Sequence, residues 1–426
     1  MIISFRLIFL LILSRLVIDF FYFNYILEIY AYEGFKGNIN SYFSNFIISL
    51  SFLFPFILNN REKFNISNYL IFILIVGILI PSSSLYSFGA ISLNWYLINF
   101  GFFIFLTLSN NYLDKFEFKS FSLNNYNLFN LFLLIIAFLS SALFVNKFGL
   151  KINLDLLTFD SDLIANQRQL YKSVAAPAGI VGYLIANLYN IIIPVLFGIS
   201  IIFKKRILML LSIVMCLIVF STTSARSLPL TLILLFGIIL IERLKSLPRQ
   251  YHYLLGYFFI LFIAGIIFYF IPKGSLLVII PALIFNRLIF SPQLVSESYF
   301  NYFQNNNYTY LLDTTIGSFI GKSYYTNLPL EIGRIFFNNA NANTGIISDG
   351  YAKMGIFGVF ISAIILLIIL KLISIISKQK NLILIKVIIT KPIFVLINGS
   401  IFTSILTNGL LISLFLITLI PHQKKE

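Results

Sequence analysis

Long runs of apolar residues, separated by short polar stretches, follow one another along the whole chain. A helix needs roughly 20 apolar residues to cross the hydrocarbon core of a bilayer, and the pattern contains about twelve runs near this length. The predicted spans cover residues 6–29, 41–58, 67–82, 90–108, 126–145, 179–203, 207–221, 228–241, 253–271, 355–376, 382–398 and 400–420. The sequence therefore predicts an all-α polytopic membrane protein, with a single transmembrane domain over residues 1–426.

Composition supports this fold class. Of the 426 residues, 59% are hydrophobic and only 11% are charged, whereas about a quarter of the residues of a soluble domain are charged. The net charge of +15 would suggest nucleic acid as a partner of a soluble protein. Here most lysines and arginines occupy short loops, where they set the orientation of the spans instead. We therefore expect no nucleic acid partner.

The basic residues of the short loops gather on one side of the predicted bilayer. They are Arg61, Lys63, Lys115, Lys119, Lys204, Lys205, Arg206, Arg243, Lys245, Arg249, Lys378, Lys380, Lys424 and Lys425. The positive-inside rule makes this side cytoplasmic, and an even number of spans then places both termini there. The first apolar run lacks a small-residue cleavage site, so we expect it to be the first span rather than a signal peptide.

Two long polar stretches are expected on the outer side, over residues 146–178 and 272–354. In the second stretch, residues 275–290 are apolar but contain Pro281 and Arg287. Broken backbone at membrane depth must line a cavity or be buried in protein, so this segment predicts a re-entrant or interfacial structure.

A helix is predicted to begin at Ser291 and Pro292, because serine caps helices and proline suits the first turn. Its stripe of large side chains consists of Leu294, Val295, Tyr299, Tyr302 and Phe303. We expect this helix to lie on the bilayer with its aromatic side down, with stacking against sugars as the alternative.

Two arginines in the outer stretches each stand eleven residues before a glycine: Arg168 before Gly179, and Arg334 before Gly345. The same spacing occurs at Arg226, where it runs into a predicted span. The outer arginines are Arg168, Arg226, Arg287 and Arg334. A guanidinium group stays charged and binds phosphate through two parallel hydrogen bonds, so these residues predict a site for a phosphorylated lipid or an acidic glycan. The alternative is that they extend toward lipid headgroups.

The first predicted span contains Arg15 and Asp19, one helical turn apart. Charged residues inside a membrane are costly unless they are paired. At this spacing the two side chains are neighbours, so we expect them to neutralise each other rather than to act on a substrate.

The outer carboxylates are Asp155, Asp160, Asp162, Glu297, Asp313, Glu331 and Asp349. Asp349 stands out because it lies where the second outer stretch re-enters the membrane, close to Arg334 in the sequence. A partly desolvated carboxylate can act as a general base toward a sugar hydroxyl. The alternative is an acid in the first turn of the following helix. Glu331 ranks behind Asp349 as a base.

Several kinds of chemistry are excluded by the residue inventory. Both histidines, His252 and His422, fall on the predicted cytoplasmic side, and the single cysteine, Cys216, lies in an apolar run and is expected to pack. An outer zinc site or a Ser-His-Asp arrangement is therefore excluded. There is also no phosphate-binding loop of the GxxxxGK form. We expect no metal and no cofactor, and a substrate that is already activated.

The chain resembles the Wzy-type polymerases of O-antigen or capsule repeat units. The matching features are the hydrophobic helical frame, the two outer arginines with their glycines, the segment NTGIISDGYAKMGIFG before a late span, and the turn TSARS around Arg226. The resemblance implies an integral glycosyltransferase of the bacterial inner membrane, with a GT-C-like architecture related to the O-antigen ligases. It also implies a glycan linked to undecaprenyl pyrophosphate as substrate, and a chain-length regulator and a flippase as partners.

The resemblance also implies roles for particular residues. Arg168 and Arg334 would hold anionic parts of the substrate. We add Asp349 to these two arginines as the catalytic set, and we expect a substrate-binding set that consists of Arg226, Arg287, Gly179, Gly345, Glu331 and Tyr351. The two glycines would let the backbone turn closely where each outer stretch meets the membrane. The related ligases use an outer histidine as base, which this chain lacks, so the identity of its base stays open.

Two other functions fit a basic, polytopic protein without an ATP site. A flippase or transporter for lipid-linked oligosaccharides is the first, and an inactive scaffold of polysaccharide export is the second. Transporters commonly show internal repeats and binding residues near the middle of the membrane. Because the polar residues of this chain gather in outer stretches instead, the sequence favours the polymerase.

Overall fold

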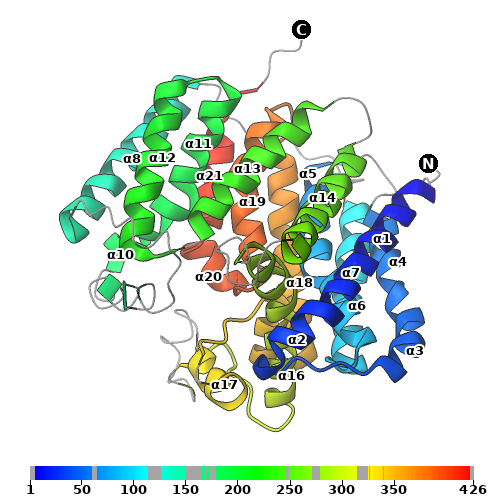
Figure 1. The fold of residues 1–426 in the computed structure, drawn as a ribbon. Coiled ribbons are helices and arrows are strands. Elements are labelled where there is room, and N and C mark those ends of the chain that lie inside the picture. The colour runs from blue at the N-terminus through cyan, green and yellow to red at the C-terminus, as the bar shows by residue number, and fades with distance from the viewer. Residues whose placement is uncertain are drawn as a thin grey trace. The chain divides into compact units, whose positions relative to one another are not determined.

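The computed structural model describes most of the chain, and every regular element in the described part is a helix (Figure 1). The described residues are 5–59, 65–113, 126–149, 163, 166–167, 170–171, 179–225, 227–244, 249–270, 279–313, 325, 327–338 and 340–422. The prediction of an all-α protein is thus confirmed for these residues.

Nine helical segments of the described part are long and apolar enough to cross a membrane. They are Phe5–Ile29, Asn40–Asn59, Ile66–Ser87, Leu128–Phe148, Gly182–Ile202, Arg206–Thr223, Arg249–Phe270, Ile346–Ile376 and Ile401–Leu419. The protein is therefore a multi-pass membrane protein by helix length and hydropathy, as the sequence predicted.

The other three predicted spans are helices that fall short of these criteria: α7 (Leu93–Leu113), α13 (Ser227–Arg243) and α19 (Leu382–Val395). α13 has 17 residues and α19 has 14, so α19 reaches only about 21 Å along its axis, against a hydrocarbon core of about 30 Å. α7 has 21 residues, but its four asparagines lower its hydropathy.

Contacts divide the chain into two compact units. Unit 1 comprises residues 1–117, 250–372 and 394–402, and unit 2 comprises residues 118–249, 373–393 and 403–426.

Unit 1 contains most of the helical elements. They are α1 (Phe5–Phe21), η1 (Tyr22–Ile26), α2 (Leu27–Ile29), η2 (Ala31–Glu33), α3 (Ile39–Ser49), η3 (Leu50–Phe52), α4 (Leu53–Asn59), α5 (Ile66–Leu74), η4 (Ile75–Leu79), α6 (Ile80–Ser87), α7, α14 (Arg249–Phe270), α15 (Ile279–Pro281), η8 (Ala282–Phe290), α16 (Ser291–Phe303), α17 (Leu328–Phe336) and most of α18 (Ile346–Ile376). α6 lies at the centre: all eight of its residues are buried, and it contacts α1, α3, α7 and α16.

Unit 2 is built from α8 (Tyr126–Phe148), α10 (Gly179–Asn187), η6 (Leu188–Ile192), α11 (Ile193–Ile202), α12 (Arg206–Thr223), α13, α19, most of α20 (Ile401–Leu406) and α21 (Leu410–Leu419). α11 is its most enclosed helix, because it packs against both α12 and α13. Cys216 on α12 is buried and unbonded to another cysteine, which fits the predicted packing role.

Prolines accompany three of the four π-helices of the described residues, the exception being η1. The π-helices η4, η6 and η8 are each followed by one residue and then by Pro81, Pro194 or Pro292. Proline has no N–H group, so carbonyls in the preceding turn lose their helical partner and the turn opens. In unit 1, the Gln293 side chain donates to the carbonyl of Gly77 at 3.2 Å. A partner outside the helix thus replaces the lost bond.

α16 departs from its prediction in two ways. It continues directly from η8 without a side-chain cap, and Ser291 donates to Asn286 instead. Its stripe of large side chains packs inside unit 1: Tyr299 and Phe303 are almost fully buried. The expectation of a helix lying on the bilayer is therefore wrong. Its polar face also finds partners within unit 1, including Ser82 for Gln293, so neither face needs water.

α18 begins at Ile346, inside the stretch predicted as outer loop, and it is broken in the middle. Met354 and Gly355 have non-helical backbone angles, and Gly355 has a φ of +61°. The N–H groups of Thr309 and Tyr310 donate to the carbonyls of Ala352 and Lys353 at 2.9 and 3.1 Å. The loop before residue 314 thus satisfies backbone groups that the break leaves without helical partners, as membrane proteins require.

Gly345 precedes α18 at a point where two backbone segments meet. A Cβ atom at this position would lie 2.3 Å from the carbonyl oxygen of Ile397. The next residue, Ile346, donates its N–H to the carbonyl of Leu396 at 3.0 Å. Only glycine permits this contact without a shift of the backbone. The structure thus gives Gly345 a packing role against another segment, while the predicted role in turning the backbone at the membrane stays a prediction.

Candidate functional site

The structure describes only some of the predicted site residues. Arg168 and Arg226 lie outside the described residues, as do Asp155, Asp160 and Asp162. Gly179 is the first residue of α10 in unit 2. The remaining candidates belong to unit 1 and are Arg287, Glu331, Arg334, Gly345, Asp349 and Tyr351. Apart from Gly179, the described candidates for the site therefore all lie in unit 1.

α17 presents Glu331 and Arg334, and its local sequence explains how. The Asn327 side chain caps the helix by accepting from the N–H of Leu330, and Pro329 occupies the first turn. Leu328, Ile332 and Gly333 form the buried face. A Cβ atom at Gly333 would overlap the carbonyl of Ala340, so the following segment can cross this helix only because the residue is glycine.

Arg334 is exposed, and no acidic side chain of the described residues pairs with it. Glu331 lies three residues earlier on the same helix, a spacing at which a glutamate commonly neutralises an arginine. Glu331 instead accepts a hydrogen bond of 2.6 Å from the Tyr302 hydroxyl. Burial and the neighbouring carboxylate raise the pKa of Tyr302, so this hydroxyl stays protonated and donates.

Asp349 lies in the first turn of α18 and is buried, with 8% of its surface exposed. One of its carboxylate oxygens accepts from Lys353 at 2.5 Å, and the other accepts from Ser400 at 2.7 Å. Both oxygens are thus engaged inside the protein. This position matches the alternative reading of Asp349 as a first-turn acid, while leaving its catalytic role a prediction.

Lys353 was not among the predicted site residues. It is 3% exposed, lies next to the break in α18 and also comes within 4.0 Å of a carboxylate oxygen of Asp313. Its ammonium group stands 5.2 Å from the ring centre of Phe402. The sequence did contain one signal for this residue, because Asp349 and Lys353 have the i,i+4 spacing of a helical ion pair.

α16 connects these groups into one arrangement. Tyr302 contacts Glu331 on α17, and Tyr299 donates to the carbonyl of Ala342 at 2.9 Å. One turn earlier, Ser296 shares a 3.0 Å hydrogen bond with Ser348, the neighbour of Asp349. A single buried helix therefore fixes both α17, with its arginine, and the start of α18, with its aspartate.

Tyr351 and Arg287, both predicted to bind substrate, lie apart from the hydrogen bonds of Glu331 and Asp349. Tyr351 is buried and its ring packs against Trp95, Phe300 and Tyr308, so it belongs to an aromatic core. The Arg287 side chain is 67% exposed and its guanidinium lies 4.0 Å from Glu33. Neither residue is joined to Arg334 by a contact within the described part of the chain.

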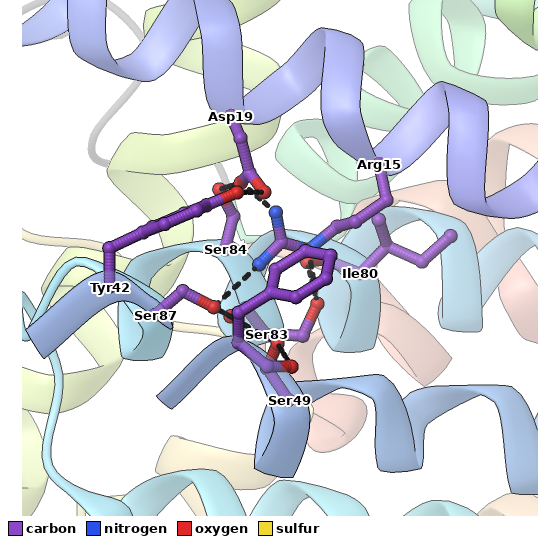
Figure 2. Close-up of polar contacts among 9 residues, drawn as sticks. Arg15, Asp19, Tyr42, Ser49, Ile80, Ser83, Ser84 and Ser87 are labelled. Atoms are coloured by element: carbon purple, nitrogen blue, oxygen red, sulfur yellow. Dashed lines mark hydrogen bonds and ion pairs between the residues drawn. The ribbon is translucent and has the colours of Figure 1, made fainter. Parts of the chain in front are cut away.

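A second ionic arrangement of unit 1 lies deep among α1, α3 and α6 (Figure 2). Arg15 forms an ion pair with Asp19, as predicted, and donates to Ser83 at 2.8 Å and to Ser87 at 3.0 Å. Asp19 also accepts from Ser84 and Tyr42, which adds a hydrogen bond to each of its carboxylate oxygens. Arg15 is fully buried, and every nitrogen of its guanidinium group is engaged.

Unit 2 contains buried lysines on the short helix α19. Lys386 pairs with Glu242 at 2.6 Å. Lys391 donates at 3.0 Å to the carbonyl of Tyr189, which lies in the π-helix η6 ahead of Pro194. Pro194 has no N–H group to donate to a carbonyl of that turn, and the Lys391 ammonium group donates to one instead. Lys391 thus has a structural role.

The chain matches no protein-family model, no curated protein and no solved structure. Within the described residues, His, Cys, Asp and Glu side chains form no group of three or more that could hold a metal ion. The arrangement of Arg334, Glu331 and Asp349 must therefore be interpreted from its own chemistry.

Proposed function

We propose that the protein is a polymerase that joins oligosaccharide repeat units linked to undecaprenyl pyrophosphate, forming O-antigen or capsular polysaccharide at the outer face of a bacterial inner membrane. The observation that carries this proposal is the environment of Arg334. Its guanidinium is exposed and unpaired among the described residues, while the acid three residues away is held by Tyr302. Such an arginine is available to an external anion.

The polymerisation reaction requires little more than the Arg334 guanidinium and a base. A sugar bound to pyrophosphate is already activated, and its departure leaves negative charge on phosphate oxygens. A guanidinium group placed at these oxygens stabilises that charge as it develops. Helix α17 supports the idea, because the exposed Ile335 and Phe336 follow Arg334 and suit the tail of a lipid-linked substrate.

Arginine variants provide the test. Arg334→Lys retains the charge but loses the paired hydrogen bonds, so the rate of polymerisation should fall roughly ten- to a hundred-fold, and Arg334→Ala should lower it further. The assay follows polymer length from purified lipid-linked repeat units, and the matched control is Arg206→Ala at another exposed arginine. Polymer of normal length and rate from Arg334→Ala would contradict the proposal.

A flippase for lipid-linked oligosaccharides is the second candidate, and the break in α18 is the observation that favours it. Broken helices with charged side chains beside the break form the binding sites of many transporters, and Asp349 and Lys353 both lie in the segment of α18 just before this break. Cells that carry Arg334→Ala distinguish the two functions. A polymerase defect leaves single repeat units on the cell surface, whereas a flippase defect removes them.

A further inference from the structure

The identity of the group that removes the proton from the attacking sugar hydroxyl can be inferred from the surroundings of two carboxylates. This inference rests on the proposed polymerase function. Asp349 is the residue favoured by the sequence, but it is buried and both of its oxygens accept hydrogen bonds, from Lys353 and from Ser400. A base needs an oxygen that can reach the substrate hydroxyl. Asp349 offers none without breaking a buried contact.

Glu331 has the opposite surroundings. It is only partly buried, and its Oε1 accepts the 2.6 Å hydrogen bond from Tyr302. Its Oε2 accepts no hydrogen bond from any described residue. One carboxylate oxygen is thus held in place while the other is left for a substrate.

The position of Glu331 relative to Arg334 also fits a base. Residues at i and i+3 lie on the same face of a helix, with Cβ atoms about 5–6 Å apart. A donor whose pyrophosphate is held by Arg334 would therefore have its reactive sugar near Glu331. Glu331 would act on the attacking hydroxyl, and Arg334 would act on the departing pyrophosphate.

We propose that Glu331 is the general base of the polymerisation reaction. In this step the acceptor hydroxyl oxygen forms a bond to the anomeric carbon of the donor sugar, and the bond from that carbon to the pyrophosphate oxygen breaks. The bonding electrons leave with the pyrophosphate, whose charge Arg334 stabilises. The hydroxyl proton passes to Oε2 of Glu331. Atoms and charge balance without a metal or a redox partner.

Tyr302 is the positioning residue for this base. Its side chain is mostly buried, and the ring of Tyr325 packs against it at 6.1 Å between centroids. The Tyr325 hydroxyl in turn donates to the backbone carbonyl of Asn307 at 2.7 Å. Because burial raises the pKa of Tyr302, the tyrosine remains a donor at neutral pH and fixes the orientation of the glutamate.

The test uses Glu331→Gln in the purified full-length protein, with lipid-linked repeat units as substrate. Glutamine keeps an oxygen for Tyr302 but cannot take a proton, so kcat should fall roughly a hundred- to ten-thousand-fold with little change in KM. The decline of the wild-type rate at low pH should also be absent from the residual activity. Glu297→Gln, at a buried glutamate on α16 rather than on α17, should keep the wild-type rate.

Other outcomes overturn the proposal in distinct ways. A Glu331→Gln rate close to wild type, or a raised KM with unchanged kcat, would show that Glu331 is not the base. A pH profile that changes in Asp349→Asn but not in Glu331→Gln would return that role to Asp349. If Glu331→Gln were poorly folded, Glu331→Ala with added formate gives a second measurement, because a small carboxylate in the vacated space should restore part of the rate. Wild-type protein that forms no polymer would refute the proposed function itself.

Discussion

Arg15 and Arg334 belong to the same unit and have opposite surroundings. Arg15 is fully buried, pairs with Asp19 and donates to two serines of α6. Arg334 is exposed on α17, and its nearest acid in sequence is bonded to Tyr302. The fold satisfies the first arginine, whereas no acidic side chain of the described residues pairs with the second.

The difference shows how burial decides the role of a charged residue in a membrane protein. A buried charge must be paired and hydrogen-bonded, since leaving it alone costs several kcal/mol. The Arg15 network meets that requirement with side chains from three helices, so it ties α1, α3 and α6 together (Figure 2). An exposed arginine has no such requirement, and its charge can be used for binding.

Removal of the buried arginine should have the largest effect on stability. Arg15→Met leaves Asp19 buried without its cation, which should cost about 3–5 kcal/mol of unfolding free energy. We expect little folded protein in detergent, measured as the monodisperse fraction after heating. Arg334→Met is the matched control and should unfold like wild type. Equal stability of Arg15→Met and wild type would mean that the network does not hold these helices together.

A buried acid without a cation sharpens the comparison. Glu297 on α16 forms no ion pair with described residues and accepts from the N–H and hydroxyl of Ser92. Burial raises its pKa, although these hydrogen bonds act in the opposite direction. The shift in the pKa of Glu297 therefore makes the free energy of unfolding depend on pH. The stabilising contribution is fully present below the unfolded-state pKa, and it is lost as the pH rises through the folded-state pKa.

Glu297→Gln removes the pH dependence of stability that arises from Glu297. The variant should unfold at a higher temperature than wild type at neutral pH, and the difference should shrink as the pH is lowered through the folded-state pKa. Thermal unfolding in detergent over a series of pH values measures both quantities. A variant that is less stable than wild type at neutral pH would show that the hydrogen bonds from Ser92 outweigh burial.

The smallest effect is expected at Arg287, which lies between the two extremes. Its side chain is 67% exposed and stands 4.0 Å from Glu33. Exposed pairs of this kind contribute about 0–1 kcal/mol, because water screens them and long side chains lose freedom. Arg287→Ala should therefore change the unfolding temperature by at most a small fraction of the change in Arg15→Met. A decrease in unfolding temperature as large as that of Arg15→Met would show that Arg287 belongs to a stabilising network.

Local sequence determined much of the fold. Apolar runs located the helices, and nine of the predicted spans have the length and hydropathy of membrane helices. The four-residue spacing of Arg15 and Asp19 was enough to predict their ion pair. Each of these features depends on residues that are neighbours along the chain.

Only the tertiary structure decided which polar and charged side chains have hydrogen-bond partners within the protein. Pairing at a distance has no signature in the local sequence, since Ser400 lies 51 residues from Asp349 and Tyr302 lies 29 residues from Glu331. The same reason explains the error at α16, which was expected to lie on the bilayer with its aromatic side down, because its partners Ser82 and Ser348 come from distant segments. Hydrogen-bond donors that arrive from distant segments determine whether a carboxylate or an arginine is buried and satisfied or left open to a substrate, and they are brought together only by folding.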